Sequence, residues 1–189
     1  MKPVLDDTEY SRLIARLDFH DTTRNSLLTF SFTTVITILG IALPLNLDDI
    51  SVILCLMPYL LIIPFSARIV YYRLSSAHIH SFLRVYAPDK TKFEHGAQIV
   101  PEGSGPTYRL IAFLVNHEMF ILALATNIVF YFKCFQCVAV WNWFNYLLVV
   151  ISLILLFIVY FITNSTFNFN KMTQKYINDW TKQRNDLNE

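Results

Sequence analysis

The sequence predicts an all-α integral membrane protein with four transmembrane helices and amphipathic cytoplasmic helices at its N- and C-terminal ends. The chain of 189 residues is 54% hydrophobic and only 15% charged, which is too apolar for an ordinary soluble domain. Its apolar residues gather in four blocks, each near the roughly 20 residues that a helix needs to cross a hydrocarbon core. The stretch at 147–162 offers almost no polar face, which argues against a soluble helical bundle.

The segment before the first apolar block, residues 1–25, predicts a short amphipathic helix. Asp6 and Glu9 have the spacing of a capping box, which marks the start of a helix. Apolar side chains then recur along one helical face, at Tyr10, Leu13, Ile14 and Leu17. Because the segment is charged and lacks a short apolar core, we expect no cleavable signal peptide, and the first span must direct insertion.

Residues 26–70 predict a transmembrane hairpin, with spans at about 26–45 and 50–70. A row of small or hydroxylated residues follows the first span at steps of three and four, which places it on one helical face: Ser26, Thr29, Thr33, Thr37 and Gly40. Such residues let helices approach closely and bond across their interface. They could instead line a water-filled pore. In the second span, Pro58 and Pro64 should kink the helix.

Residues 71–107 predict a cytoplasmic extension of the second span, followed by a loop. The stretch from Ala67 to Tyr86 has no helix breaker, so the helix should continue well beyond the membrane. One face of this extension holds residues in helical register, at Leu74, His78, Phe82 and Tyr86. The remainder of the segment contains three of the four glycines and is therefore expected to be rich in turns.

Residues 108–164 predict a second transmembrane hairpin, with spans at about 108–132 and 143–163. Asn116, His117 and Glu118 lie roughly eight residues into the third span. Ionisable groups at membrane depth are costly, which makes these residues candidates for a functional role. If the span begins at His117 instead, the same residues are ordinary interfacial groups.

The connection between the third and fourth spans contains the motif KCFQC. Cys134 and Cys137 would face the outer side, where oxidising conditions permit a disulfide or a redox pair. No strand or helix context of a thioredoxin-like site surrounds them, so a structural disulfide or two ordinary thiols is the favoured interpretation.

Residues 165–189 predict a second amphipathic helix, which leaves the membrane after the fourth span. Met172, Tyr176 and Trp180 recur at four-residue steps between charged side chains. Such a helix could lie on the lipid surface or pack against the N-terminal helix.

The distribution of basic residues predicts the topology. With four spans, all but one of the 15 Lys and Arg residues fall on the same side, and the exception is Lys133. Because basic residues are enriched on the cytoplasmic side of membrane proteins, both termini and the central loop should be cytoplasmic. The net charge of +1 carries no information about partners.

No motif in the sequence specifies a reaction, a cofactor or a metal. There is no glycine-rich phosphate loop and no GxSxG nucleophile elbow. His78 and His80 would lie about 200° apart on a helix, which is poor geometry for metal chelation. We therefore expect no enzyme, no cofactor and no direct nucleic-acid binding. A membrane-embedded enzyme that uses His117 and Glu118 is the least favoured alternative.

Several stretches, among them LDFHDTTRNSLLTFSFTTVITILGIAL, SFLRVYAPD and LVNHEMF, resemble small four-span bacterial inner-membrane proteins that have no assigned activity. The resemblance covers most of the chain and implies a bacterial inner-membrane location. At the level of architecture, the chain is also similar to small membrane effectors of antiphage defence operons. Those effectors oligomerise and permeabilise the inner membrane when a partner or a nucleotide signal arrives.

The leading hypothesis is a homo-oligomeric conditional pore or membrane-disrupting effector, surrounded by membrane lipid and acting in antiphage defence. Its cytoplasmic helices would dock a protein or sense a nucleotide signal. The alternative is a non-conducting membrane anchor or regulatory subunit that holds a soluble cytoplasmic partner.

The predicted topology can be tested by labelling single cysteines in intact cells. A cysteine at Asp48 or Trp141 should react with a membrane-impermeant reagent, because both positions are expected outside. A cysteine at Pro101 should react only after the membrane is opened. Labelling at Pro101 in intact cells would contradict the four-span topology.

Overall fold

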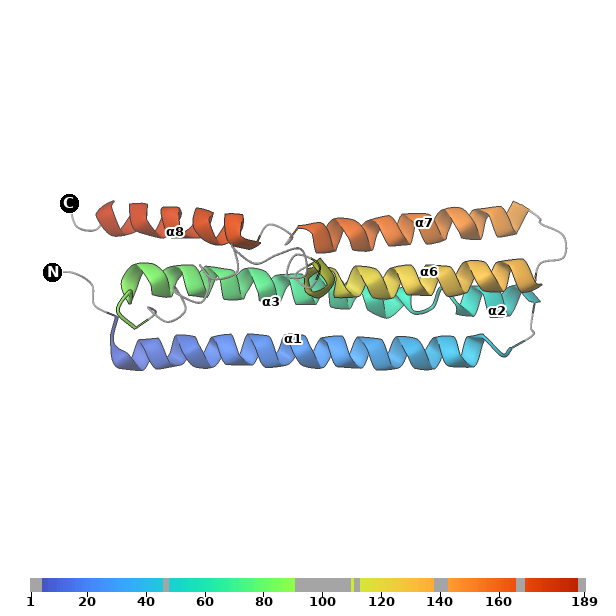
Figure 1. The fold of residues 1–189 in the computed structure, drawn as a ribbon, viewed down its shortest axis with the longest axis horizontal. Coiled ribbons are helices and arrows are strands. Elements are labelled where there is room, and N and C mark those ends of the chain that lie inside the picture. The colour runs from blue at the N-terminus through green and yellow to red at the C-terminus, as the bar shows by residue number, and fades with distance from the viewer. Residues whose placement is uncertain are drawn as a thin grey trace. The chain divides into compact units, whose positions relative to one another are not determined.

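The computed structural model describes residues 5–45, 48–90, 110, 113–137, 143–165 and 169–186, and the regular elements among them are all helices. They follow one another along the chain (Figure 1) as α1 (Asp7–Ala42), α2 (Asp48–Leu54), α3 (Tyr59–Tyr86), α6 (Glu118–Cys137), α7 (Trp143–Asn164) and α8 (Phe169–Asp186).

Four helical stretches are long and apolar enough to cross a membrane. They are Asp7–Ala42, Val52–Tyr86, Glu118–Gln136 and Trp143–Asn164. The predicted all-helical class and its four apolar helices are thus confirmed. The side of the membrane on which the termini lie stays a prediction, because no membrane is present in the structure.

The chain divides into two compact units. One, which we call the terminal unit, comprises the described residues of Met1–Thr23, Tyr71–Val115 and Thr166–Glu189. The other, the apolar unit, comprises those of Arg24–Val70 and Asn116–Ser165. Helices α1 and α3 each contribute to both units.

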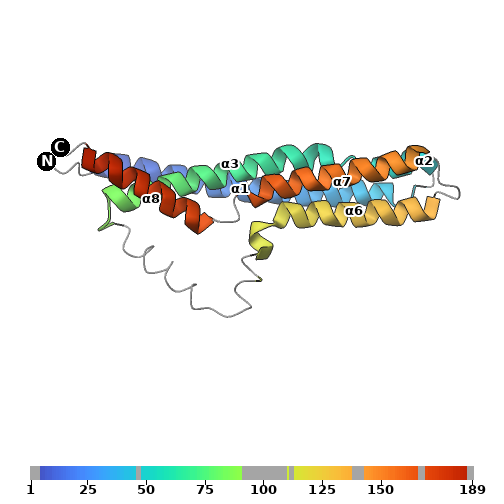
Figure 2. The ribbon, with the colours of Figure 1, turned by 90° about the horizontal axis from the view of Figure 1, so that it is seen from above.

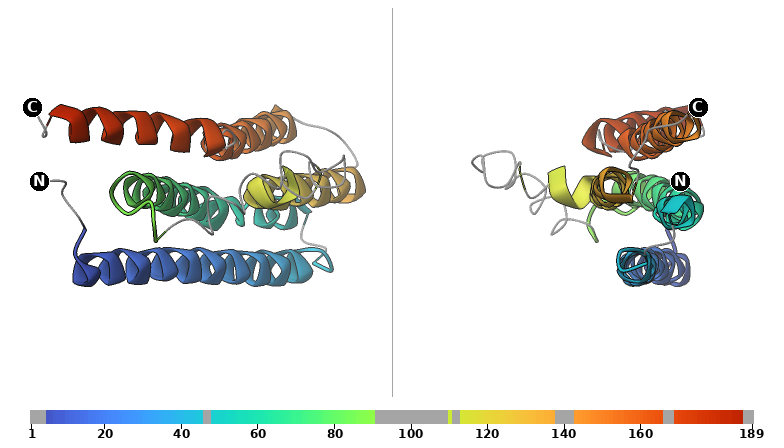
Figure 3. Two further views of the ribbon diagram at one scale, coloured as in Figure 1. Left: turned by 60° about the vertical axis from the view of Figure 1, so that its left-hand side comes forward. Right: turned by 90° about the vertical axis from the view of Figure 1, so that its right-hand side faces the viewer.

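The apolar unit is built around α3 and α6. In the most apolar part of each candidate span, 39% of the residues are buried in the span that contains α3 and 44% in α6. The corresponding share is 22% in both α1 and α7. Helix α6 packs on both α7 and α2. Seen end-on, α2 and α6 lie between α7 and α1 (Figure 3). Helices α1 and α7 therefore present the larger outward faces.

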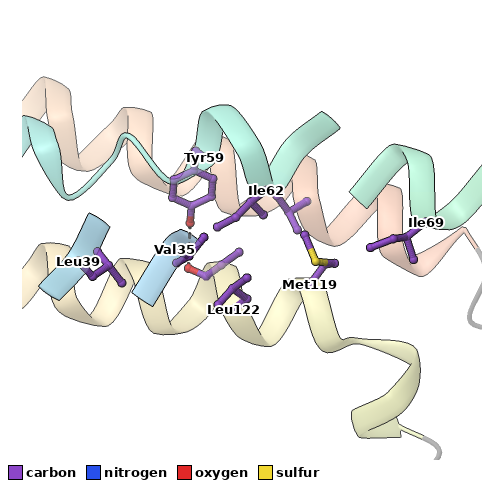
Figure 4. Packing of buried hydrophobic residues seen from close by; sticks show 9 residues of the cluster. Val35, Leu39, Tyr59, Ile62, Ile69, Met119 and Leu122 are labelled. Carbon is purple, nitrogen blue, oxygen red and sulfur yellow. Dashed lines mark hydrogen bonds between the residues drawn. The ribbon is translucent and has the colours of Figure 1, made fainter. Parts of the chain in front are cut away.

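Apolar side chains from four helices form the centre of this unit, and α7 contributes Val159. Val35 and Leu39 of α1 meet Ile62 of α3 and Leu122 of α6 in one buried cluster (Figure 4). A second cluster joins α2, α6 and α7 with the end of α1, through Ala42, Val52, Cys55, Phe130, Cys134 and Leu148. Between helices in a membrane, such clusters stabilise the arrangement through close van der Waals packing.

The second predicted span is interrupted rather than only kinked. Helix α2 ends at Leu54, the residues from Cys55 to Pro58 form turns, and α3 begins at Tyr59. Pro58 has no backbone N–H to donate to the carbonyl of Leu54, and its ring opposes a continuous helix. Backbone hydrogen bonds that span three residues form in the turn instead, such as the bond from the Leu56 N–H to the carbonyl oxygen of Ile53 at 2.9 Å. Pro64 lies inside α3.

The terminal unit packs the beginning of α1 and α8 on the second half of α3 (Figure 2). Leu17 of α1 is buried with Ile79 and Leu83 of α3. Three residues in helical register on α3 form ring contacts with Trp180 of α8, namely His78, Phe82 and Tyr86. The two predicted register faces of α3 and α8 thus meet each other.

Helix α1 runs without interruption from Asp7 to Ala42. The sequence pattern predicts a short helix within residues 1–25 before the first span, whereas in the structure residues 7–25 and the first span belong to one helix. No proline occurs within α1, and its one glycine, Gly40, comes in the last turn, so nothing breaks the helix earlier.

Candidate functional site

The hydroxylated row of α1 faces away from the rest of the apolar unit. All of its members are exposed: Ser26, Thr29, Thr33, Thr37 and Gly40. Val35 and Leu39, which pack into the core, lie on the opposite side of the helix. At Gly40, an added Cβ would meet nothing within 4 Å. The row therefore does not serve packing within the chain.

The threonine hydroxyls of this row bond to their own helix. Oγ1 of Thr29 donates to the carbonyl oxygen of Asn25 at 3.0 Å, and Thr33 donates to that of Thr29 at 2.9 Å. Thr37 donates in the same way to the carbonyl oxygen of Thr33 at 2.8 Å. Since the protons of these three threonines are already used, they need no external acceptor, but their hydroxyl oxygens keep lone pairs that can accept a bond.

A buried hydrogen-bond network links α3, α6 and α7. The hydroxyl of Tyr59 lies 3.0 Å from the carbonyl oxygen of Ala123 and 2.9 Å from Oδ1 of Asn127. Nδ2 of Asn127 in turn donates to the carbonyl oxygen of Ser152 at 3.4 Å. The side chains of Tyr59, Asn127 and Ser152 are at most 2% exposed, so these bonds form away from solvent.

Tyr131 extends the network toward α7. Its hydroxyl lies 3.1 Å from Oγ of Ser152, and Ser152 Oγ itself donates to the carbonyl oxygen of Val149 at 2.8 Å. Serine has one hydroxyl proton, so when Ser152 donates to Val149, Tyr131 is the donor to Ser152. The network thus satisfies its buried groups mutually and acts as a polar link between apolar helices.

A second polar link joins α6 to the end of α1. Lys133 is only 1% exposed, and its Nζ donates to the carbonyl oxygen of Leu43 at 2.7 Å. Leu43 follows directly after Ala42, the last residue of α1. Carbonyl groups at a helix C-terminus lack intrahelical partners and carry partial negative charge, so an ammonium group caps this end favourably.

The three polar residues predicted inside the third span lie at a break in the helix. Residues 113–116 are helical, His117 is a bend, and α6 begins at Glu118. The His117 side chain is 3% exposed, and its ring centroid lies 6.5 Å from that of Phe120. Glu118 occupies the first turn of α6, where a carboxylate is favoured by the helix dipole. This placement favours the interfacial interpretation of Asn116, His117 and Glu118, whose functional role stays a prediction.

The predicted disulfide is not tested by the structure. Cys134 is fully buried in the cluster of α2, α6 and α7. The side chain of Cys137 lies outside the described residues. A bond between Cys134 and Cys137 therefore stays a prediction.

Within the described part of the chain, no group of three or more His, Cys, Asp or Glu residues is arranged to hold a metal ion. Comparisons with protein-family models, curated proteins and solved structures find no match to this chain.

The importance of the network can be measured with Tyr59→Phe, which removes the hydroxyl and keeps the ring. The free energy of unfolding should fall by about 1 kcal/mol, because the substitution removes the one phenol proton that Asn127 Oδ1 and the Ala123 carbonyl oxygen share. Unfolding in mixed detergent micelles would provide the measurement. Tyr160→Phe is the matched control, since Tyr160 is 42% exposed. Equal losses in the two variants would contradict a specific role for the network.

Proposed function

We propose that this is a homo-oligomeric, multi-pass membrane protein whose copies meet along the hydroxylated row of α1. We further propose that the assembly acts as a conditional pore or membrane-disrupting effector. The observation that supports this function is the outward orientation of the row, whose members are exposed while the hydroxyl protons of its three threonines bond to α1 itself.

The contrast between the two outer helices supports a second copy, rather than lipid, as the partner of the row. The exposed face of α7 is bulky and apolar, as suits lipid, at Val150, Leu153, Ile154, Phe157 and Phe161. The row on α1 is small, and it is flanked by the exposed side chains of Phe30, Ile36 and Ile41. A shallow strip between larger apolar side chains lets two helix backbones approach closely.

The hydrogen bonds of the threonine hydroxyls suit the row both to a closed helix interface and to a hydrated lining. In a closed assembly, the threonines pack without leaving an unsatisfied donor, because their protons are bound at i−4 carbonyls. In an open assembly, the remaining oxygen lone pairs accept bonds from water in the passage. A rearrangement of α1 helices around a common axis would thus convert a helix interface into a hydrated lining.

The packing of the apolar unit supports α1 as the helix that rearranges. Hydrogen bonds of Tyr59 and Asn127 connect α3, α6 and α7 to one another, with the carbonyl oxygen of Ser152 as the acceptor on α7. Helix α1 joins the core mainly through apolar side chains such as Val35 and Leu39, together with the Lys133 cap at its end. Apolar contacts are not directional, so they tolerate rotation better than hydrogen bonds do.

The alternative function, a membrane anchor for a soluble partner, is favoured by the order of the terminal unit. Ser81 of α3 lies at the contact with α8, where its Oγ is 3.1 Å from the carbonyl oxygen of Thr173 and shares its one proton with the carbonyl oxygen of Ala77 at 2.7 Å. A second bond runs from Arg184 to the carbonyl oxygen of Val85 at 3.0 Å. The concentration of basic residues on one side of the predicted spans supports a cytoplasmic position for the terminal unit in a bacterial cell. There it could bind a protein or a nucleotide signal.

Thr33→Leu tests the proposed function. If the row packs against a second copy, the larger side chain should weaken the oligomer by about tenfold in its dissociation constant, or about 1.4 kcal/mol. If the row lines the open passage, the oligomer should persist and ion flux into liposomes should fall, because an apolar ring favours dewetting. Size in detergent and flux are measured on the same preparation.

Ala125→Leu is the matched control for this experiment, since Ala125 is an exposed small residue on α6 outside the row. It should change neither size nor flux. Unchanged size and flux in Thr33→Leu as well would contradict the proposal. A wild-type oligomer without flux under any trigger would favour the anchor over the pore.

A further inference from the structure

His20 is a buried histidine in the contact between α1 and α3 of the terminal unit, before the apolar stretch that starts at Ser26. Its side chain is 5% exposed, and its ring centroid lies 5.3 Å from that of Tyr72, at an interplanar angle of 47°. Nδ1 of His20 is buried and has no hydrogen-bond partner. The imidazole is thus held by packing and not by a polar partner at this atom.

The net effect of the surroundings of His20 is to disfavour its charged form. On α1, Arg16 opposes a positive charge and Asp21 favours one. Burial and Arg16 together outweigh Asp21 and lower the pKa of His20 below its ordinary value of 6.5. On α3, the group that meets His20 is the phenol of Tyr72, whose own ring packs against Tyr71.

Helix α3 cannot supply a compensating carboxylate. Its sequence from Tyr59 to Tyr86 contains no Asp or Glu, and its charged residues are Arg68, Arg73 and Arg84. A proton on His20 would therefore add a positive charge to a contact whose partner helix carries only positive ones. Hydration of the imidazolium would require the two helices to separate.

We propose that His20 is a proton-sensitive switch, in which protonation of the imidazole loosens the contact between α1 and α3 near the start of the apolar stretch of α1. This goes beyond the proposed function, because it concerns a trigger and needs neither an oligomer nor a pore. The buried contact between His20 and Tyr72 is the element that changes.

The direction of the pH dependence follows from the lowered pKa. Above pH 6.5, His20 is neutral whether the contact is closed or open, and the contribution of the contact to stability is complete. As the pH falls below 6.5, the open form binds protons first, and the contact weakens until the pH passes the lowered pKa of the closed form. Acidification therefore opens the contact, whereas alkaline conditions do not.

Hydrogen exchange of the full-length protein in lipid nanodiscs tests the switch. Backbone amides around His20 and Tyr72 should exchange faster at pH 5.5 than at pH 7.5 after correction for the intrinsic pH effect, by at most roughly tenfold. This limit holds because, one pH unit below the ordinary value of 6.5, the imidazole of the open form is protonated about ten to one. His20→Phe keeps a ring in the contact but cannot titrate, so its corrected exchange should not depend on pH.

Two further variants make the outcome decisive. His78→Phe removes another histidine of the same unit, one that contacts Trp180 of α8, and it should retain the wild-type pH response. His20→Gln should abolish the response, even if loss of the ring makes exchange faster at both pH values. Wild-type exchange independent of pH, or an unchanged response in His20→Phe, would overturn the proposal.

Discussion

Polar groups within apolar helices must be satisfied by the protein itself, and the way in which each helix meets this constraint organises the apolar unit. On α1, hydroxyls donate to carbonyl groups one turn earlier on the same helix, as at Thr33 and Thr37. Hydroxyls on α3, α6 and α7 do the same, as at Ser66, Thr126 and Thr163, but in addition Tyr59 and Asn127 donate to neighbouring helices. Bonds within one helix leave it separable, whereas bonds between helices fix their arrangement.

The interruption before α3 contributes to this arrangement. Because the turn from Cys55 to Pro58 ends one helix and starts another, Tyr59 occupies the first turn of α3. From there its hydroxyl reaches α6, and Asn127 passes the connection on to α7. At the other end of α6, buried Lys133 caps the carbonyl oxygen of Leu43. Polar side chains therefore fix α6 against three parts of the chain.

Composition and periodicity were sufficient to predict the four apolar helices, because the length of an apolar run reports directly on a span. They could not place the start of α6, since the apolar run from Tyr108 gives no boundary and the structure has its bend at His117. The prolines indicated a distortion of the second span, but not the turn that replaces a helical segment.

The candidate site was predictable only in part, for a similar reason. Helical spacing places Thr29, Thr33 and Thr37 on one face, but it does not say whether that face points inward or outward. The partnership of Tyr59 with Asn127 joins residues 68 positions apart, which local periodicity cannot reveal. The burial of Lys133 was missed as well. Lys133 is the one basic residue in the connection between the third and fourth predicted spans, and this isolated position could have indicated a buried role.

The central claim, that the outward face of α1 meets a second copy, is tested most directly by disulfide cross-linking in native membranes. Single cysteines are placed at each position of the first span, and the unsubstituted chain serves as the background for its native cysteines. The account predicts cross-linked dimers that peak at Thr29, Thr33 and Thr37 and are minimal at the buried positions Val35 and Leu39. Uniform yields, or a maximum at Val35 and Leu39, would contradict it.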